Sequence, residues 1–146
     1  MSAGDVVPNE ELWRRQEAAY VETPYHLHLG LVLHVDGPGE VVVRLTPPPW
    51  ASNRNGTIAG GILTTMIDSA VCQAAKTLAE PHLRVWTVAM NVDFVHPARL
   101  GSDVVVRGRI ESMRRTIAVG IGRALGPDGE LLAVGLVTAT LRPPTA

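Results

Sequence analysis

The stretch Asn53-Arg-Asn-Gly-Thr-Ile-Ala-Gly-Gly-Ile-Leu-Thr-Thr-Met-Ile-Asp68-Ser-Ala70 says most about the architecture and the chemistry of this chain. It places the pair Gly60-Gly61 where a helix begins, and it places Asp68 about two turns further along. The unpaired N–H groups at the start of a helix can hold a developing negative charge. A carboxylate on an otherwise apolar helix is costly to bury and therefore needs a reason. Together these residues predict an oxyanion-binding helix end and a carboxylate that attacks or activates water.

The separation of Gly60 and Asp68 predicts how many copies of the chain form a site. Eight residues of helix rise by about 12 Å, so one reacting carbonyl cannot touch both groups of the same helix. If both groups act on the same atom, they come from two copies of the chain. The spacing therefore predicts a homodimer, at least, with sites between its subunits.

Residues 62–78 carry the strongest helical pattern in the chain. Apolar residues recur at helical spacing along one face: Ile62, Leu63, Met66, Ile67, Ala70, Val71, Ala74, Ala75 and Leu78. The opposite side carries only small or polar residues, which suits close packing against another backbone: Thr64, Thr65, Asp68, Ser69, Cys72, Gln73 and Lys76. The alanines keep this helix slim, as expected for a helix that a sheet wraps.

The rest of the chain predicts one further helix and several strands. A short helix is expected over residues 8–20 with Asn9 as its N-cap, ended by Thr23-Pro24, after a loose terminus at residues 1–8. Strands rich in Val, Ile and Thr are expected at residues 26–35 (with a bulge at Gly30), 40–46, 84–95, 103–112, 116–125 and 130–141. Turns at residues 36–39 and 126–129 join neighbouring strands, so the sheet is expected to be antiparallel and the fold class α+β.

Composition limits the classes of function. A chain of 146 residues with 46% hydrophobic and 18% charged residues is expected to form one domain, residues 1–146, with residues 1–22 as an N-terminal segment that holds the short helix. The net charge of −1 argues against nucleic acid or an anionic membrane as a partner. The chain has one cysteine, no apolar run of about 20 residues and no signal-like N-terminus, so we expect a cytoplasmic protein.

Two motifs resemble those of hotdog-fold thioesterases, and most closely those of PaaI-type acyl-CoA thioesterases. The first is Asn53-x-x-Gly56-Thr57-x-Ala59-Gly60-Gly61 followed by Asp68, and the second runs from Thr87 to Gly101. The resemblance covers residues 28–142 and implies a long antiparallel sheet wrapped around one central helix. It also implies hydrolysis of an acyl-CoA thioester by a homodimer or homotetramer. Coenzyme A enters as part of the substrate, without a metal or other cofactor.

The resemblance also implies roles for single residues. Asp68 would be the catalytic carboxylate, and the backbone N–H of Gly60 would polarise the thioester carbonyl from the opposite subunit. Asn53 would help to position the substrate or the attacking water, and the Thr87 hydroxyl would help to hold that water. Gly61 is a further substrate-binding candidate. Arg115, at an expected turn, suits the phosphates of coenzyme A.

Each of these residues also has a purely structural interpretation. Asp68 can bond backbone or pair with an arginine, Thr87 is a common strand residue, and Asn53 lies in a loop rich in turn formers. Whether Asp68 acts as nucleophile or as general base stays open. His26, His28 and His34 lack the partners of a metal site, and Cys72 fits a small buried residue.

One departure from the family pattern keeps a second function open. The family usually has His immediately before the glycine pair, and here the residue is Ala59. The alternative is a non-catalytic acyl-CoA-binding hotdog protein, which would keep the dimer without hydrolysing the thioester. A hotdog hydratase or dehydratase would pair a His with an acid in a different arrangement, for which the sequence offers no convincing match.

Overall fold

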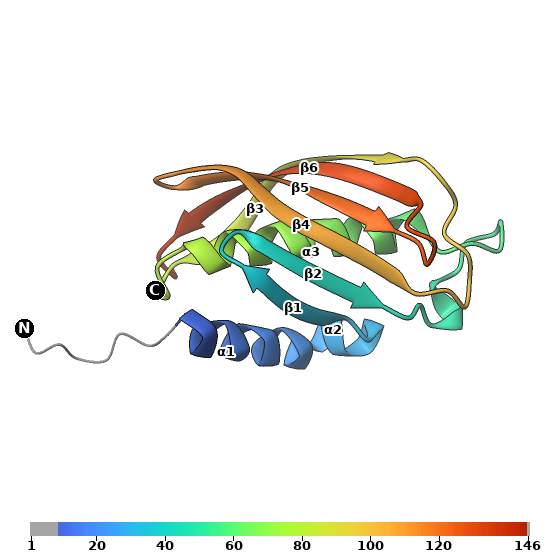
Figure 1. The fold of residues 1–146 in the computed structure, drawn as a ribbon, viewed down its shortest axis with the longest axis horizontal. Coiled ribbons are helices and arrows are strands. Elements are labelled where there is room, and N and C mark those ends of the chain that lie inside the picture. Colours follow the sequence, from blue (N-terminus) through green and yellow to red (C-terminus); the bar gives the residue numbers. More distant parts are fainter. Residues whose placement is uncertain (1–8, 146) are drawn as a thin grey trace, which may run out of the picture.

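A computed structural model describes residues 9–145 of the chain, in which one antiparallel sheet curves around a long helix (Figure 1). The helices are α1 (Asn9–Glu22), α2 (Pro24–Leu29), the 3-10 helix η1 (Pro49–Ala51) and α3 (Gly60–Leu78). The strands are β1 (Val32–Gly37), β2 (Glu40–Leu45), β3 (Arg84–Phe94), β4 (Val104–Arg114), β5 (Ile117–Leu125) and β6 (Leu131–Arg142). The strand order across the sheet is β1-β2-β4-β5-β6-β3, with every pair antiparallel. The expected α+β class is therefore confirmed.

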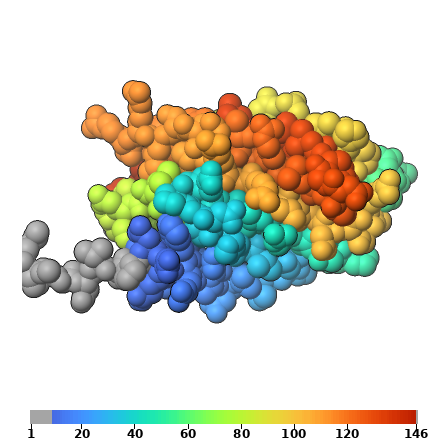
Figure 2. Space-filling view, viewed as in Figure 1, coloured from blue at the N-terminus to red at the C-terminus, as the bar shows by residue number. Residues whose placement is uncertain are grey.

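The apolar stripe of α3 forms the centre of the core. Seven of its nine expected positions are buried, and these are Leu63, Met66, Ile67, Ala70, Val71, Ala74 and Ala75. The stripe packs against the inner face of the sheet, to which Val43, Val106 and Val137 contribute fully buried side chains. On the outside, α1 covers the β1 edge of the sheet (Figure 2). Within residues 9–145, the β3 edge, in contrast, has no neighbouring strand.

A row of glycines marks where α3 presses closest to the sheet. Gly108, Gly122 and Gly135 are register partners across β4, β5 and β6. A Cβ atom added at Gly108 would lie 2.7 Å from the Ala70 backbone, and one at Gly122 or Gly135 would lie 2.8 Å from the Ile67 side chain. These glycines therefore let the helix backbone approach the sheet.

We expect Gly108→Ala to destabilise the fold by about 1–3 kcal/mol, because the added methyl would overlap backbone that cannot swing away. A denaturant titration of the purified variant measures the change. Gly37→Ala is the matched control, since a Cβ at Gly37 meets nothing within 4 Å. Equal stability of the two variants would contradict the close approach at Gly108.

The expected strand over residues 26–35 is wrong in its first half, because residues 24–29 form the short helix α2 instead. Pro24 occupies the first turn of that helix, where the missing N–H has no cost. Gly30 is its C-cap, with a φ of 82°, and is not a bulge. His26 is fixed there by stacking on Tyr20 and by a 2.9 Å hydrogen bond with the Tyr20 carbonyl. The alternation of polar and apolar residues at 26–29 was therefore misleading.

The other expected elements are confirmed to within a few residues at each end. The short N-terminal helix begins at Asn9 and runs to Glu22, and the long helix begins at Gly60. The expected loose terminus at residues 1–8 lies outside the described residues.

Candidate active site

Asp68 lies on α3 facing β3, and the structure brings it together with Thr87. The Thr87 hydroxyl donates a hydrogen bond of 2.5 Å to Oδ1 of Asp68. The pairing of β3 with β6 shifts register between Thr87 and Ala89, which marks a bulge beside this contact. Bulges of this kind re-aim side chains and are common next to active sites. Two of the four expected catalytic residues therefore meet within one chain.

Cys72 is a third member of this cluster, and the sequence did not single it out as a partner. Its thiol donates to Oδ1 of Asp68 at 3.7 Å and lies 3.3 Å from the Thr87 hydroxyl oxygen. Burial raises the pKa of Cys72 to about 11, against a smaller opposing effect of the Thr87 hydrogen bond. The sulfur is thus a protonated donor at neutral pH and not a thiolate nucleophile. Its position four residues after Asp68, on the same face of the helix, was the available signal.

The two donors leave one oxygen of the carboxylate open. Thr87 and Cys72 both donate to Oδ1 of Asp68, and within residues 9–145 no hydrogen bond reaches Oδ2. A carboxylate held by one oxygen keeps its orientation while the other oxygen remains available. That oxygen can attack an electrophilic carbon or accept a proton from water.

Gly60 is the first residue of α3, at the positive end of a helix of 19 residues. On either side of the glycine pair, Ala59 N–H donates to the Ala51 carbonyl and Ile62 N–H to the Ala59 carbonyl, whereas within residues 9–145 no acceptor is described for Gly61 N–H. Among the described residues, the Gly60 amide has no acceptor. The Phe94 ring packs beside it, and a Cβ at Gly60 would lie 3.0 Å from that ring. Gly61 follows as the second, exposed residue of the helix.

Asn53 organises the loop that leads into α3. Its Oδ1 accepts hydrogen bonds from the Asn55 and Thr57 amides at 2.9 and 3.2 Å, and its Nδ2 donates to Thr57 Oγ1 at 2.9 Å. This is the turn-forming use of an asparagine side chain. Within the described part of the chain, no hydrogen bond joins Asn53 to Asp68 or Thr87.

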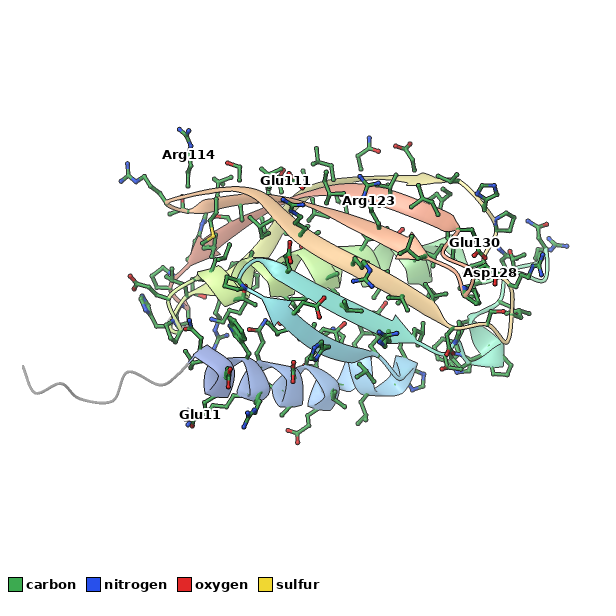
Figure 3. All side chains as sticks on the ribbon, viewed as in Figure 1. Glu11, Glu111, Arg114, Arg123, Asp128 and Glu130 are labelled. Atoms are coloured by element: carbon green, nitrogen blue, oxygen red, sulfur yellow. The ribbon has the colours of Figure 1, made fainter. Side chains whose placement is uncertain are left out.

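Arg115 lies apart from the other candidates, in the exposed turn between β4 and β5. It has a φ of 48°, in the left-handed region, and it makes no described hydrogen bond or ion pair with the Asp68 cluster. Its neighbour Arg114 points away from the sheet at the tip of this turn (Figure 3). The turn lies at the end of the molecule where α3 terminates, opposite to Gly60 of the same chain (Figure 1).

Two further observations on residues 9–145 concern metal ions and membranes. No group of three or more His, Cys, Asp or Glu side chains in this range is arranged to hold a metal ion. His34 instead lies 3.3 Å from Glu17 and 3.4 Å from Asp36. None of the helices described here has the length and apolar character needed to span a membrane.

Comparison with known proteins gives one family and several similar folds. The thioesterase superfamily matches residues 55–133, a range that contains α3, β3, β4 and β5. Acyl-coenzyme A thioesterase 13 of Homo sapiens is 28% identical over 105 residues, which are 71% of this chain and 74% of that protein.

Solved structures show the same architecture. The E. coli PaaI protein from the phenylacetic acid degradation operon superposes with a TM-score of 0.84 at 18% identity, covering 94% of this chain and 97% of that chain. A thioesterase family protein from Silicibacter pomeroyi gives a TM-score of 0.82 at 25% identity, covering 90% of this chain and 98% of that chain.

Proposed function

Since the chain belongs to the thioesterase superfamily and has its hotdog fold, we propose that it hydrolyses an acyl-CoA thioester to a free acid and coenzyme A. The observation that carries this proposal is the carboxylate of Asp68, held at Oδ1 by Thr87 and Cys72 with Oδ2 open. The relative named acyl-coenzyme A thioesterase supports the choice of acyl-CoA among thioesters. The family and the fold make the chain a thioester hydrolase of PaaI-like type. The step that we propose beyond this is that its thioester substrate is an acyl-CoA.

The proposed reaction can follow two routes. In the first, Oδ2 of Asp68 attacks the thioester carbon, the C–S bond breaks, coenzyme A leaves as the thiolate, and water then hydrolyses the mixed anhydride. In the second, Oδ2 takes a proton from water, and the water oxygen attacks the carbon while the thiolate leaves. Labelled oxygen found in Asp68 after a single turnover in isotopically labelled water would demonstrate the first route, because it enters when water attacks Cγ of Asp68 in the anhydride, and the second route never exchanges an oxygen of Asp68.

In either route, the donor proposed to stabilise the oxyanion is the backbone amide of Gly60 of the partner subunit. Gly60 and Asp68 of one helix are separated by about 12 Å of rise, too far for one carbonyl to touch both. An amide at a helix start is a donor of the kind that stabilises a developing oxyanion. Gly61 then adjoins the bound carbonyl. Asn53 keeps the role of shaping the loop before Gly60, and Arg115 stays a candidate for the phosphates of coenzyme A.

The exposed β3 edge gives the proposed homodimer a physical basis. This strand has 11 residues, ends the sheet and exposes apolar side chains, with Trp86 at 50% and Val88 at 60%. Long, exposed, apolar edges pair readily with another chain. Pairing of β3 with the β3 of a second copy would set the two α3 helices side by side across the Asp68 cluster. A homotetramer built from two such dimers remains compatible with this arrangement.

A panel of acyl-CoA substrates with a thiol-detecting dye tests the proposed function. The purified protein should release free coenzyme A from at least one member, with no metal or redox cofactor added. Tight binding of acyl-CoA without release would instead support the binding-protein alternative that Ala59 raised. If the protein neither releases coenzyme A from any member of the panel nor binds any of them, the proposed function is wrong.

A further inference from the structure

A cavity of about 1020 Å³ lies beside the Asp68 cluster, between α1, the C-terminal half of α3 and the start of β3. From α1 it is lined by residues at helical spacing, including Leu12, Gln16 and Ala19, and Thr23 lines it just after the helix ends. Its size lies at the upper end of the range of about 300–1,000 Å³ that small-molecule pockets occupy. The catalytic roles proposed above leave this cavity without a function.

Cys72 connects the cavity to the reacting carboxylate. It lines the cavity, and its sulfur lies 3.7 Å from Oδ1 of Asp68 and 3.3 Å from Oγ1 of Thr87. The cavity therefore begins within one helical turn of Asp68. A substrate whose carbonyl carbon reaches Oδ2 of Asp68 has this space directly beside it.

Two hydrogen bonds fix the direction in which the cavity runs. The Tyr20 hydroxyl bonds Ser69 at 2.5 Å, and Gln16 Nε2 donates to Gln73 Oε1 at 2.8 Å, so α1 and α3 are antiparallel. Ala19, which is itself exposed, thus lies at the end of the cavity near Asp68, here called the inner end, and Leu12 lies towards the opposite, outer end. Along α3 the wall from Cys72 to Leu78 rises by about 9 Å.

Most of the polar groups in the wall have partners within the protein, whereas the exposed Arg84 side chain has no hydrogen bond or ion pair among residues 9–145. Gln16 and Gln73 bond each other, and Arg15 pairs with Glu11. Lys76 donates to the Leu83 carbonyl and, at 2.9 Å, to the Pro81 carbonyl. Burial, with a smaller effect of nearby Arg84, lowers the pKa of Lys76 from its usual value. Lys76 is only partly buried, and its two carbonyl acceptors satisfy the ammonium group without a charged ligand.

Apolar side chains from α1, the end of α3 and β3 form much of the wall, and we infer that the cavity binds the acyl group of the substrate, as an apolar chain or ring of several carbons. The apolar contributors are Leu12, Trp13, Ala19, Ala79 and Val85. The inference rests on the proposed function, since it places the acyl group of that thioester. In the bound substrate, the coenzyme A portion then extends from the Asp68 cluster in the direction away from α1, towards solvent.

Tryptophan substitutions along α1 test this assignment as a molecular ruler. Ala19→Trp should lower kcat/KM for dodecanoyl-CoA relative to acetyl-CoA about ten-fold or more, because the indole fills the inner end of the cavity. Leu12→Trp, at the outer end, should lower the value for dodecanoyl-CoA more than that for octanoyl-CoA. Ala18→Trp is the matched control, since Ala18 is an exposed neighbour on α1 that does not line the cavity.

The outcomes separate this inference from the proposed function. If Ala19→Trp and Leu12→Trp, each confirmed as folded by thermal unfolding, keep the chain-length profile of the Ala18→Trp control, the acyl group binds elsewhere. If they raise KM equally for every acyl-CoA, the cavity holds the coenzyme A portion, and the inference is wrong while the function stands. If the unmodified protein hydrolyses no member of the series, the proposed function fails and the inference falls with it.

Discussion

Asp68→Asn is expected to lower kcat/KM for acyl-CoA hydrolysis by about three orders of magnitude. The substitution keeps the size of the side chain and leaves an amide oxygen to accept the Thr87 hydrogen bond. The amide nitrogen that replaces Oδ2 can neither attack the thioester carbon nor accept a proton from water. The loss should therefore appear in kcat with little change in the assembly of the protein. Release of coenzyme A, followed with a thiol-detecting dye at several substrate concentrations, measures it.

Asp103→Asn is the matched control for this variant. Asp103 also accepts a hydrogen bond from a threonine hydroxyl, that of Thr46 at 2.7 Å, but it lies outside the cluster. Asp103→Asn should retain the activity of the unmodified protein. Undiminished turnover by Asp68→Asn, with an unchanged elution volume on size exclusion, would refute the role of Asp68.

Gly60→Pro is expected to lower kcat by about 10²–10³-fold, because it removes a main-chain oxyanion donor. The structure makes this deletion feasible. Gly60 is the first residue of α3, where proline is favoured, and Ala59 already has the extended φ of −59° and ψ of 133° that a residue before proline adopts. The helix should therefore form normally without the Gly60 N–H. Steady-state kinetics with the best acyl-CoA of the panel provide the measurement.

Gly60→Ala separates the loss of the amide from the gain of a side chain. Both substitutions add a Cβ that would meet the Phe94 ring at 3.0 Å, and that ring is 55% exposed and free to move aside. Only the proline variant loses the N–H. If both variants lose activity equally, then contact with Phe94, and not the amide, explains the loss.

Much of the fold could be predicted because its main elements have strong local patterns. The apolar stripe of residues 62–78 identified α3, and turn residues at 126–129 joined two strands rich in Val, Ile and Thr. The helix at Pro24–Leu29 was missed because Pro24 ends one helix and also begins the next. The glycines of β4, β5 and β6 form a row facing α3 only when the three strands are paired in register. No short window of sequence therefore reveals the role of Gly108 or Gly122.

The candidate site was predicted in part. The family resemblance implied that Asp68 is the catalytic carboxylate and that Thr87 helps to hold the attacking water; the structure brings these two residues into direct contact, although they lie 19 positions apart in the chain. The contact of Cys72 with Asp68 follows from their spacing on α3, but its contact with Thr87 involves β3 beside a bulge that the sequence does not locate. The role of Asn53 in positioning the substrate or the attacking water stays a prediction, and its side chain bonds the loop that leads into α3.

Mixing two inactive variants tests most directly whether Gly60 of one chain serves Asp68 of the other. Co-expression of Asp68→Asn with Gly60→Pro gives mixed dimers in which one of the two sites has an intact amide and an intact carboxylate. Random pairing should restore about a quarter of the activity of the unmodified protein, although each variant alone is nearly inactive. A mixture that forms mixed dimers, shown by differently tagged chains, yet stays as inactive as its components would contradict a site shared between subunits.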